Sequence, residues 1–345
     1  MTAVRTRIRS TYPYHIPLLF FIIFIGVGLF WGAVQPPPAA DHTGPPASLM
    51  MPLNFLYIGA VTSGCMVWMW RSPAKKKNRA RRVSLFAVGL WLVLLAGLVG
   101  TQNLQLEGFF FSLLSGAVAG GLVHYSVSKV FGPLVLGRSW CGWGCWTAMV
   151  LDSLPFKRSP GRWPQRWLRW LPYAHFGASL ALVLVLWQAV GYQPDMHSWG
   201  LDMLLWFVIG NALYYAVAIA MAFALKDNRA FCKYLCPVNV PIRIGARFSL
   251  AKIGSDAAKC TGCDACSKMC PMDIRVSEYA KNGQRVLSTE CIMCQACVNV
   301  CAKDAIRLSL GLDVSGDDRL RYITDPAQPR RALTPAAVPA PADVR

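Results

Sequence analysis

The chain has 345 residues, of which 54% are apolar and only 15% charged, and its mean hydropathy is +0.37. These figures exclude an ordinary soluble domain, which carries about 25% charged residues. They also exclude a disordered chain, which would contain fewer aromatic residues than the 12% found here. The net charge of +18 could reflect nucleic acid, anionic lipid or membrane topology.

Six apolar stretches are long enough to cross a bilayer as helices, because a hydrocarbon core about 30 Å thick requires about 20 apolar residues. We expect spans at 16–34, 53–70, 83–100, 109–131, 171–190 and 203–225, which makes residues 1–225 a six-helix transmembrane domain. The first stretch has the basic start of a secretory signal. Its apolar core is longer than the roughly 7–15 residues of such signals, so we interpret it as an uncleaved span.

The positive charges lie on one side of this topology. The connections at 35–52, 101–108 and 191–202 contain no Lys or Arg, so all 35 cations lie on the other side. The positive-inside rule makes that side cytoplasmic. The sequence therefore predicts a multi-pass membrane protein with cytoplasmic N and C termini. This topology accounts for the charge, and no nucleic-acid partner is expected.

Four cytoplasmic segments complete the predicted organisation. Residues 137–170 form a basic, Trp-rich loop that contains a C-x-x-x-C motif, and residues 226–258 form a linker with a second such motif, followed by Pro. Residues 259–310 are a soluble, cysteine-rich module. The Pro- and Ala-rich tail at 311–345 is expected to be disordered, and its composition is also compatible with a docking extension.

Eight of the thirteen cysteines form two copies of the pattern C-x-x-C-x-x-C-x-x-x-C, at 260–270 and 291–301. Three thiolates at this spacing bind three irons of one cluster, and the fourth reaches the neighbouring cluster in two-cluster ferredoxins. Structural zinc usually uses paired C-x-x-C elements, and disulfides are not expected in the cytoplasm. We predict two [4Fe–4S] clusters, the first held by Cys260, Cys263, Cys266 and Cys301, the second by Cys291, Cys294, Cys297 and Cys270.

A β-hairpin is expected between these motifs, because residues 275–288 contain two strand-like runs joined by Asn282-Gly283. The predicted fold class is therefore a mainly α polytopic membrane protein with six transmembrane helices. It ends in a cytoplasmic, two-cluster ferredoxin-like α+β module.

A second repeat lies at the expected cytoplasmic ends of spans four and six. Residues 138–145 (RSWCGWGC) and 229–236 (RAFCKYLC) share the order Arg, any residue, aromatic, Cys, any residue, aromatic, any residue, Cys. Each residue of the second copy follows its counterpart in the first copy by the same number of positions. This constant offset indicates that spans three and four are duplicated in spans five and six. The four thiols could bind Cu(I), zinc or an iron–sulfur cluster, cycle as dithiols, or remain inert in the core. This candidate redox or metal site comprises Cys141, Cys145, Cys232 and Cys236.

Three further residues are singled out within the spans. His124 in span four and His175 in span five could flank a quinone head group, and we do not expect them to bind haem. Cys65, alone in span two, is interpreted as a small core residue. The sequence contains no nucleotide-binding fingerprint, which argues against direct oxidation of NAD(P)H.

The combination of paired C-x-x-x-C motifs at the ends of spans and a two-cluster module resembles the NapH, NosR and CcoG group of polytopic membrane ferredoxins. The resemblance covers about 83–310 and rests on twelve cysteines. Residues 232–237 (CKYLCP) match the group's motif fully, whereas Trp146 follows the first motif where the group usually has Pro. NosR proteins add a flavin-bearing domain and CcoG proteins an Ig-like domain, for which we see no room here. The resemblance is therefore closest to NapH-like proteins.

This resemblance implies an electron-transfer subunit of a quinol dehydrogenase in the bacterial inner membrane. Such a subunit passes electrons between the membrane quinone pool and a partner redox protein of ferredoxin or cytochrome type. Two alternatives stay open: a CcoG-like copper reductase or assembly factor for a metalloenzyme, and a membrane-anchored redox regulator. We assign no catalytic residue from the sequence.

Overall fold

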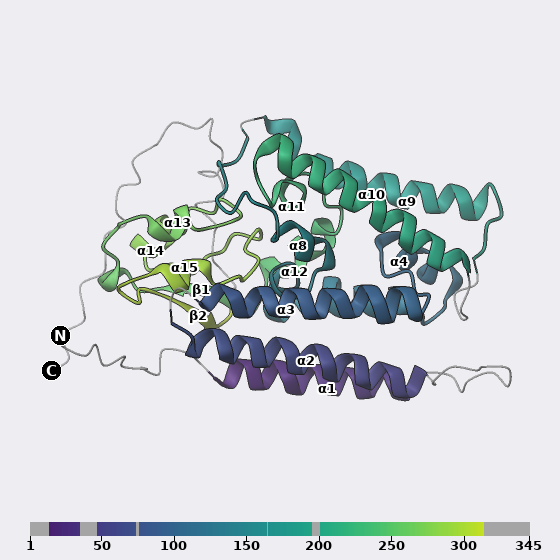
Figure 1. Cartoon of the computed structure of the whole chain (residues 1–345), viewed down its shortest axis with the longest axis horizontal. Helices are drawn as coiled ribbons and strands as arrows, with labels where there is room; N and C mark the ends of the chain where they lie inside the picture. Colours follow the sequence, from purple (N-terminus) through teal and green to yellow (C-terminus); the bar gives the residue numbers. More distant parts are fainter. Residues whose placement is uncertain (1–13, 35–46, 74–75, 164, 195–200, 314–345) are drawn as a thin grey trace.

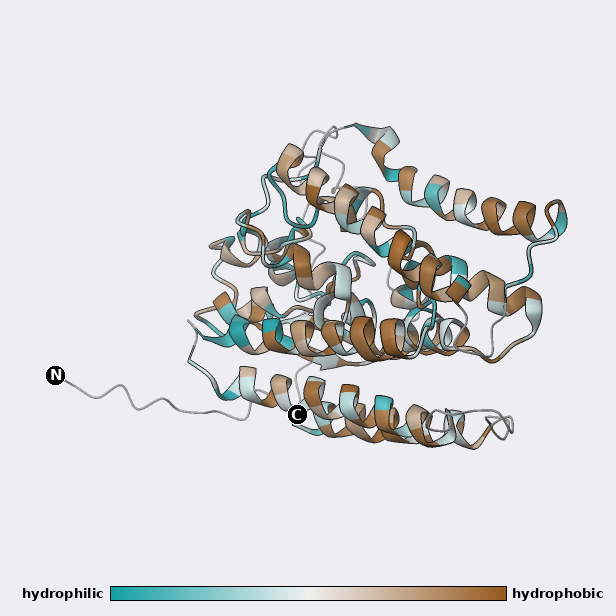
Figure 2. Ribbon diagram, turned by 45° about the vertical axis from the view of Figure 1, so that its right-hand side comes forward, coloured by the Kyte–Doolittle hydropathy of each residue, from teal (hydrophilic) through white to brown (hydrophobic). Residues whose placement is uncertain are grey.

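The computed structural model of the chain describes residues 14–34, 47–73, 76–163, 165–194 and 201–313. Among them, five helices are long and apolar enough to cross a membrane. These are α1 (His15–Ala33), α2 (Ala47–Arg71), α3 (Lys77–Trp91) with its π-helical continuation η1 (Leu92–Val99), α9 (Leu171–Gln188) and α10 (Leu201–Leu225). They run side by side, as Figure 1 shows, and Figure 2 colours much of their length as hydrophobic. Many of their apolar side chains are exposed. Five of the six expected spans are thus confirmed as helices.

The fourth expected span, over 109–131, is not one continuous helix. The chain forms α4 (Leu106–Ser115), then α5 (Gly120–Tyr125), η2 (Ser126–Phe131) and α6 (Gly132–Leu136), with a bend of 116° between Leu106–Ser115 and Gly120–Leu136. Gly116 ends α4 in the left-handed conformation, with φ +68°, which glycine adopts without a steric penalty. A Cβ at Gly121 would lie 2.7 Å from the Asn103 carbonyl oxygen and 2.9 Å from the Gly108 carbonyl carbon. Glycines therefore permit the bend and the close packing beside it.

The second repeat forms two equivalent short helices between the long ones. These are α7 (Ser139–Trp143) and α11 (Ala230–Tyr234), and the repeat arginine directly precedes each. The connecting elements are α8 (Trp146–Leu151), η3 (Arg166–Arg169) and α12 (Asn239–Arg247). Figure 1 shows α8, α11 and α12 between the long helices and the cysteine-rich module.

The cysteine-rich module is built around one two-stranded sheet. Strands β1 (Ala251–Ser255) and β2 (Ile306–Leu310) are antiparallel, and Ile253 is opposite Leu308. Between the strands lie η4 (Ala257–Lys259), α13 (Ala265–Lys268), α14 (Val276–Lys281) and α15 (Ala296–Val300). Strand β1 precedes residue 259 and so lies within the residues that the sequence assigned to the linker.

The β-hairpin expected at 275–288 is wrong, because its first half is helix α14. The Asn282-Gly283 pair ends this helix instead of turning between strands: Gly283 has φ +61°, and the Gln284 N–H donates to the Tyr279 carbonyl at 3.0 Å. A left-handed glycine with this hydrogen bond is a common helix ending. The two strands that pair instead flank the cysteine motifs in sequence: β1 precedes the first motif and β2 follows the second.

The module packs against one end of the helix bundle, as Figure 1 shows. Trp70, near the end of α2, donates from Nε1 to Gln295 Oε1 at 2.9 Å. Trp143 of α7 donates to the Met293 carbonyl at 3.0 Å. Both contacts reach the second cysteine motif, so this motif faces the bundle. The tail that the sequence predicts to be disordered lies outside the described residues beyond Asp313.

The packing around Gly121 yields a stability prediction. We expect Gly121→Ala to lower the free energy of unfolding by about 1–3 kcal/mol, because the added methyl group overlaps the Asn103 carbonyl. Gly177→Ala in α9 is the matched control, since a Cβ there meets nothing within 4 Å. Its effect is expected to be neutral or stabilising by up to about 1 kcal/mol. Thermal unfolding in detergent measures both, and equal stability of the two variants would contradict this packing.

Candidate functional site

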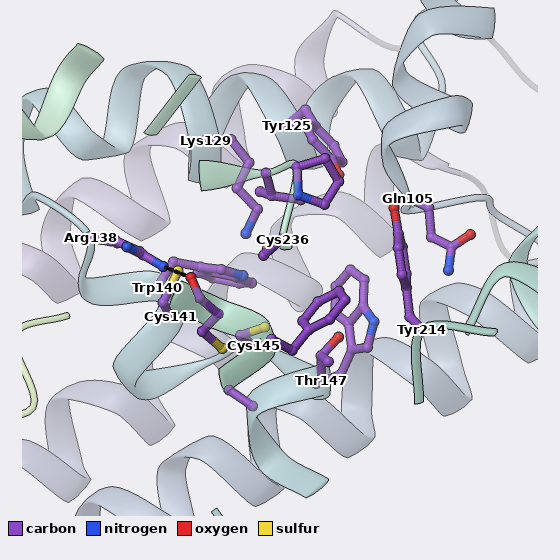
Figure 3. Close-up of a pocket in the computed structure, with 16 residues that line it drawn as sticks. Gln105, Tyr125, Lys129, Arg138, Trp140, Cys141, Cys145, Thr147, Tyr214 and Cys236 are labelled. Carbon is purple, nitrogen blue, oxygen red and sulfur yellow. Dashed lines mark hydrogen bonds between the residues drawn. The ribbon is translucent and has the colours of Figure 1, made fainter. Parts of the chain in front are cut away.

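The structure brings the four cysteines of the second repeat together around one cavity. Cys141 and Cys145 come from α7 and the residues after it, and Cys232 and Cys236 from α11 and the residues after it. Figure 3 shows three of them beside Lys129, Arg138 and Trp140, with Gln105 and Tyr214 on the other side of the same pocket. We refer to these two parts as the cysteine end and the amide end of the cavity.

The two cysteine motifs have the same local geometry. In the first, the Cys145 N–H donates to the Trp140 carbonyl at 3.1 Å; in the second, the Cys236 N–H donates to the Phe231 carbonyl at 2.9 Å. Each motif is thus a single helical turn closed by the main-chain N–H of its second cysteine. The repeated sequence therefore corresponds to a repeated structure.

The arginines of the two repeats connect them to each other. Arg138 donates from Nη2 to the Cys232 carbonyl at 3.0 Å, and Arg229 donates from Nη1 to the Cys141 carbonyl at 3.1 Å. Each arginine of one repeat therefore binds the first cysteine of the other. Both arginines are 1% exposed. A charge buried to this degree requires a partner, because removing it from water is costly.

Carboxylates supply these partners. Arg138 pairs with Glu290 at 2.7 Å, and Arg229 pairs with Asp152 at 2.6 Å. Burial alone would raise the pKa of Asp152, but Arg229 and Arg81 lower it. Asp152 is therefore ionised at neutral pH. The pKa of Glu290, given below, indicates the same for that carboxylate.

Glu290 also connects the module to the bundle. Its carboxylate lies 2.6 Å from Arg243 and 3.5 Å from Arg162, in addition to Arg138. Burial alone would raise its pKa, but the three arginines together lower it to about 2. Three cations around one anion leave this interface positively charged. Because Glu290 precedes Cys291, the excess charge lies beside the second cysteine motif.

A second cavity, inside the module, is lined by four ferredoxin-motif cysteines: Cys270, Cys291, Cys294 and Cys297. This is the set that the sequence assigned to the second cluster. Burial raises the pKa of both Cys270 and Cys291 to about 12. These thiols are neutral at pH 7 without metal, so a metal that binds them must displace their protons.

The other four cysteines differ in exposure. Cys266 is buried on α13, Cys260 and Cys301 are partly buried, and Cys263 is exposed. Cys301 follows α15, which packs against α13. The chain therefore brings the first motif and the end of the second motif to neighbouring elements, on a more exposed part of the module.

A residue between two of the cysteines that line the first cavity packs against residues that line the second. Gly142 lies between Cys141 and Cys145, and a Cβ at this position would overlap the Ile292 carbonyl oxygen and lie 3.7 Å from the Cys294 nitrogen. Ile292 and Cys294 line the module cavity. Only glycine allows the two chains to approach this closely.

Within the described part of the chain, no three His, Cys, Asp or Glu side chains are placed so that they could hold one metal ion. An iron–sulfur cluster spaces its ligands differently, because each thiolate binds a different iron. Its thiolates therefore lie farther apart than ligands that share one ion.

The histidines singled out in the sequence do not line the cysteine cavity. The His124 ring lies 5.2 Å from the Trp140 ring and 5.3 Å from the Trp146 ring. His175 Nδ1 lies 2.9 Å from the Leu235 carbonyl oxygen. Cys65 is buried in α2 beside Met66 and Met69, as expected for a core residue.

Sequence reasoning missed three polar groups that line the cavity. Gln105 Nε2, Trp140 Nε1 and the Tyr214 hydroxyl are buried and have no hydrogen-bond partner. Trp140 lies within the repeat, but Gln105 and Tyr214 have no local motif that distinguishes them from other polar residues of the spans. Buried donors of this kind normally have partners, so the three mark a place where a ligand can bind.

Comparison with protein families agrees with the two cysteine arrangements. A model described as a 4Fe-4S dicluster domain matches residues 252–302, which contain both ferredoxin motifs. A second model, described as a 4Fe-4S binding domain, matches residues 130–162 and 199–254, which contain both C-x-x-x-C motifs. The protein thus carries 4Fe–4S clusters as its cofactors.

Curated relatives match parts of the chain. The ferredoxin-type protein NapH of Haemophilus influenzae is 27% identical over 210 residues, 57% of this chain and 70% of NapH. The methylamine utilization ferredoxin-type protein MauN of Methylorubrum extorquens is 27% identical over 168 residues, 46% of this chain and 57% of MauN. An uncharacterized protein of Methanocaldococcus jannaschii is 36% identical over 96 residues, 28% of this chain and 37% of that protein.

The chain therefore spans between 37% and 70% of the length of these relatives. No solved structure matches it. The apolar helices, the two family matches and the ferredoxin-type relatives agree with one another. The chain is therefore similar to NapH-like ferredoxin-type membrane proteins, and it carries the 4Fe–4S domains that the two family models describe.

Proposed function

We propose that this ferredoxin-type electron transport protein passes electrons between the membrane quinone pool and a partner redox protein. The observation that carries the proposal is the contact between the two cavities. The cysteine cavity lies among the helices of the bundle, and Gly142 joins its wall to residues 292–294 of the module cavity. A path for electrons thus leads from the apolar bundle into the cluster-binding module.

The arrangement of the module suggests the order of its clusters. The ligand set Cys270, Cys291, Cys294 and Cys297 lies on the bundle side, because Trp143 and Gly142 contact residues 292–294. The set Cys260, Cys263, Cys266 and Cys301 includes the exposed Cys263. We assign the first of these sets to exchange with the bundle and the second to exchange with the partner.

The amide end of the cavity is suited to a quinone head group. Gln105 Nε2 and the Tyr214 hydroxyl are buried hydrogen-bond donors without partners, and quinone carbonyl oxygens are acceptors. The cavity is otherwise lined mainly by aromatic and apolar side chains, which is typical of a site for a small organic ligand. Of the two histidines that the sequence proposes for a quinone site, His175 lies behind this end of the cavity, with its ring 5.6 Å from the Tyr214 ring.

The positive residues support a cytoplasmic position for the module. The basic connection between α2 and α3 lies at the end of the bundle where Trp70 contacts the module. The positive-inside rule assigns such a connection to the cytoplasm. On this basis the module, and with it the partner, is on the cytoplasmic face of the inner membrane.

The amide end yields a kinetic prediction. In proteoliposomes, quinol should reduce the clusters, and Tyr214→Phe should raise the KM for quinol about three- to tenfold, because one hydrogen bond contributes about 0.5–1.5 kcal/mol. Tyr215→Phe is the matched control, since Tyr215 is the next residue of α10 and does not line the cavity. Cluster absorbance recorded after quinol is added gives the rates. An unchanged KM in the Tyr214 variant, or the absence of any reduction in the wild-type protein, would contradict the proposal.

The Glu290 contacts yield a second prediction. Glu290→Gln should slow electron transfer from the bundle into the module and increase amide exchange at residues 292–295, because three arginines lose their shared anion. Removing one partner of a buried ion pair costs about 3–5 kcal/mol. Glu278→Gln is the control, because among the described residues Glu278 pairs only with Arg275, at 3.5 Å and with both side chains partly exposed. If hydrogen exchange is the same in both variants, Glu290 does not hold the module in place.

A further inference from the structure

We infer that residues 101–105, which we call the polar segment, carry the protons of quinol from the cavity to the side of the membrane opposite the module. The inference rests on the proposed function, in which quinol is oxidised at the amide end of the cavity. Each quinol that becomes quinone gives up two electrons and two protons. The electrons pass to the clusters of the module, and the protons pass to water along the polar segment. Oxidation of quinol therefore separates charge across the membrane.

The polar segment enters the bundle from the end that lies away from the module. It connects η1 to α4, and Figure 1 shows α4 far from the cysteine-rich module. At its inner end, Gln105 packs on α10, where a Cβ at Gly210 would overlap Gln105 Oε1. Gly210 lies about 14 Å along the helix from the start of α10 at Leu201. The segment thus reaches from the outer end of the bundle to the amide end of the cavity.

Glycines on α4 and α5 make room for this segment. A Cβ at Gly120 would lie 2.9 Å from Gln102 Oε1, and one at Gly121 would lie 2.7 Å from the Asn103 carbonyl oxygen. A Cβ at Gly108 would overlap that same carbonyl oxygen. Non-helical main chain at membrane depth is tolerated only where protein buries it or where it lines water. The neighbouring helices therefore accept a polar, non-helical chain inside an apolar bundle.

Three side chains of the segment carry buried polar atoms that have no hydrogen-bond partner. These atoms are Thr101 Oγ1, Asn103 Nδ2 and Gln105 Nε2. The three residues are only 8%, 2% and 2% exposed, so bulk water does not satisfy them. Buried polar groups in proteins normally bind an ordered water when no protein group is available. A row of such groups from η1 to the cavity can hold a chain of water molecules, and protons move along such chains.

The main chain at Thr101 supports a functional role for its hydroxyl group. Thr101 follows η1 with φ +47°, in the left-handed region that glycine adopts without a steric penalty. A β-branched residue is strained there, and strain of this kind is concentrated at functional sites. The sequence therefore retains a hydroxyl at the outer end of the segment although glycine would fit the main chain better.

The charges around the cavity favour the same direction for protons. Lys129 and Arg138 line the cysteine end, and both are almost completely buried. Buried cations repel protons. At the other end, Glu107 lies in the first turn of α4, and its Oε1 accepts a hydrogen bond from Ser179 Oγ at 2.8 Å. A proton released at the amide end therefore moves away from the module and towards the polar segment.

Proton release in proteoliposomes tests the inference. The vesicles hold ubiquinol in the membrane and a pH-sensitive dye inside, and ferricyanide is added outside. Only molecules with an outward-facing module can then pass electrons to the oxidant. Each ubiquinol reduces two ferricyanide ions, and we expect two protons to appear inside the vesicle for each such pair. Vesicles without protein correct for direct oxidation of ubiquinol, and a protonophore should abolish the pH difference.

Thr101→Val tests the route itself. Valine has nearly the shape of threonine and the same branched Cβ, so cluster content and thermal stability should be retained. We expect internal acidification to slow about two- to tenfold, because the path loses one hydrogen-bonding group. Thr62→Val is the matched control, since Thr62 is also buried but lies in α2.

Two results would overturn the inference while the proposed function stands. The first is reduction of ferricyanide with protons that appear only in the external medium. The second is internal acidification at the same rate in the Thr101→Val and Thr62→Val proteins. If the wild-type protein does not transfer electrons from ubiquinol to ferricyanide, the proposed function fails, and the inference fails with it.

Discussion

The structure depends on the carbonyl and carboxylate partners of two buried arginines. Arg138 and Arg229 are each 1% exposed, and each holds a main-chain carbonyl of the opposite repeat and a carboxylate elsewhere in the chain. Without these partners, two charges would be buried in an apolar domain at a cost of several kcal/mol each. The hydrogen bonds of the two arginines hold four cysteines around one cavity. The ion pair of Arg138 holds Glu290, and with it the module, against the bundle.

Glycine plays a complementary part where chains must approach closely. Gly142 allows the first cysteine motif to lie against residues 292–294, and Gly121 allows α5 to pack on the residues before α4. Larger residues at either position would separate elements that the arginines bring together. The ion pairs and the close packing at glycine thus both hold the bundle against the cysteine-rich module.

Much of this organisation could be predicted from the sequence. Apolar length located five spans, cysteine spacing indicated the clusters, and the offset between Arg138 and Arg229 indicated the duplication. The bend in the fourth span could not be predicted, because composition does not show that Gly116 adopts a left-handed conformation. The hairpin was wrong because Asn282-Gly283 suits a helix ending as well as a turn. Gln105 and Tyr214 could not be found, because only the tertiary fold shows that their polar groups lack partners.

We propose that the cysteine cavity connects the membrane interior to the module. Freeze-quench EPR of the full-length protein in liposomes, mixed rapidly with a reduced quinone, is the most direct test. We expect the module signals to appear in the wild-type protein and to appear more slowly when Cys145 and Cys236 are replaced by serine. Reduction of the module clusters at an undiminished rate in that variant would contradict the proposal.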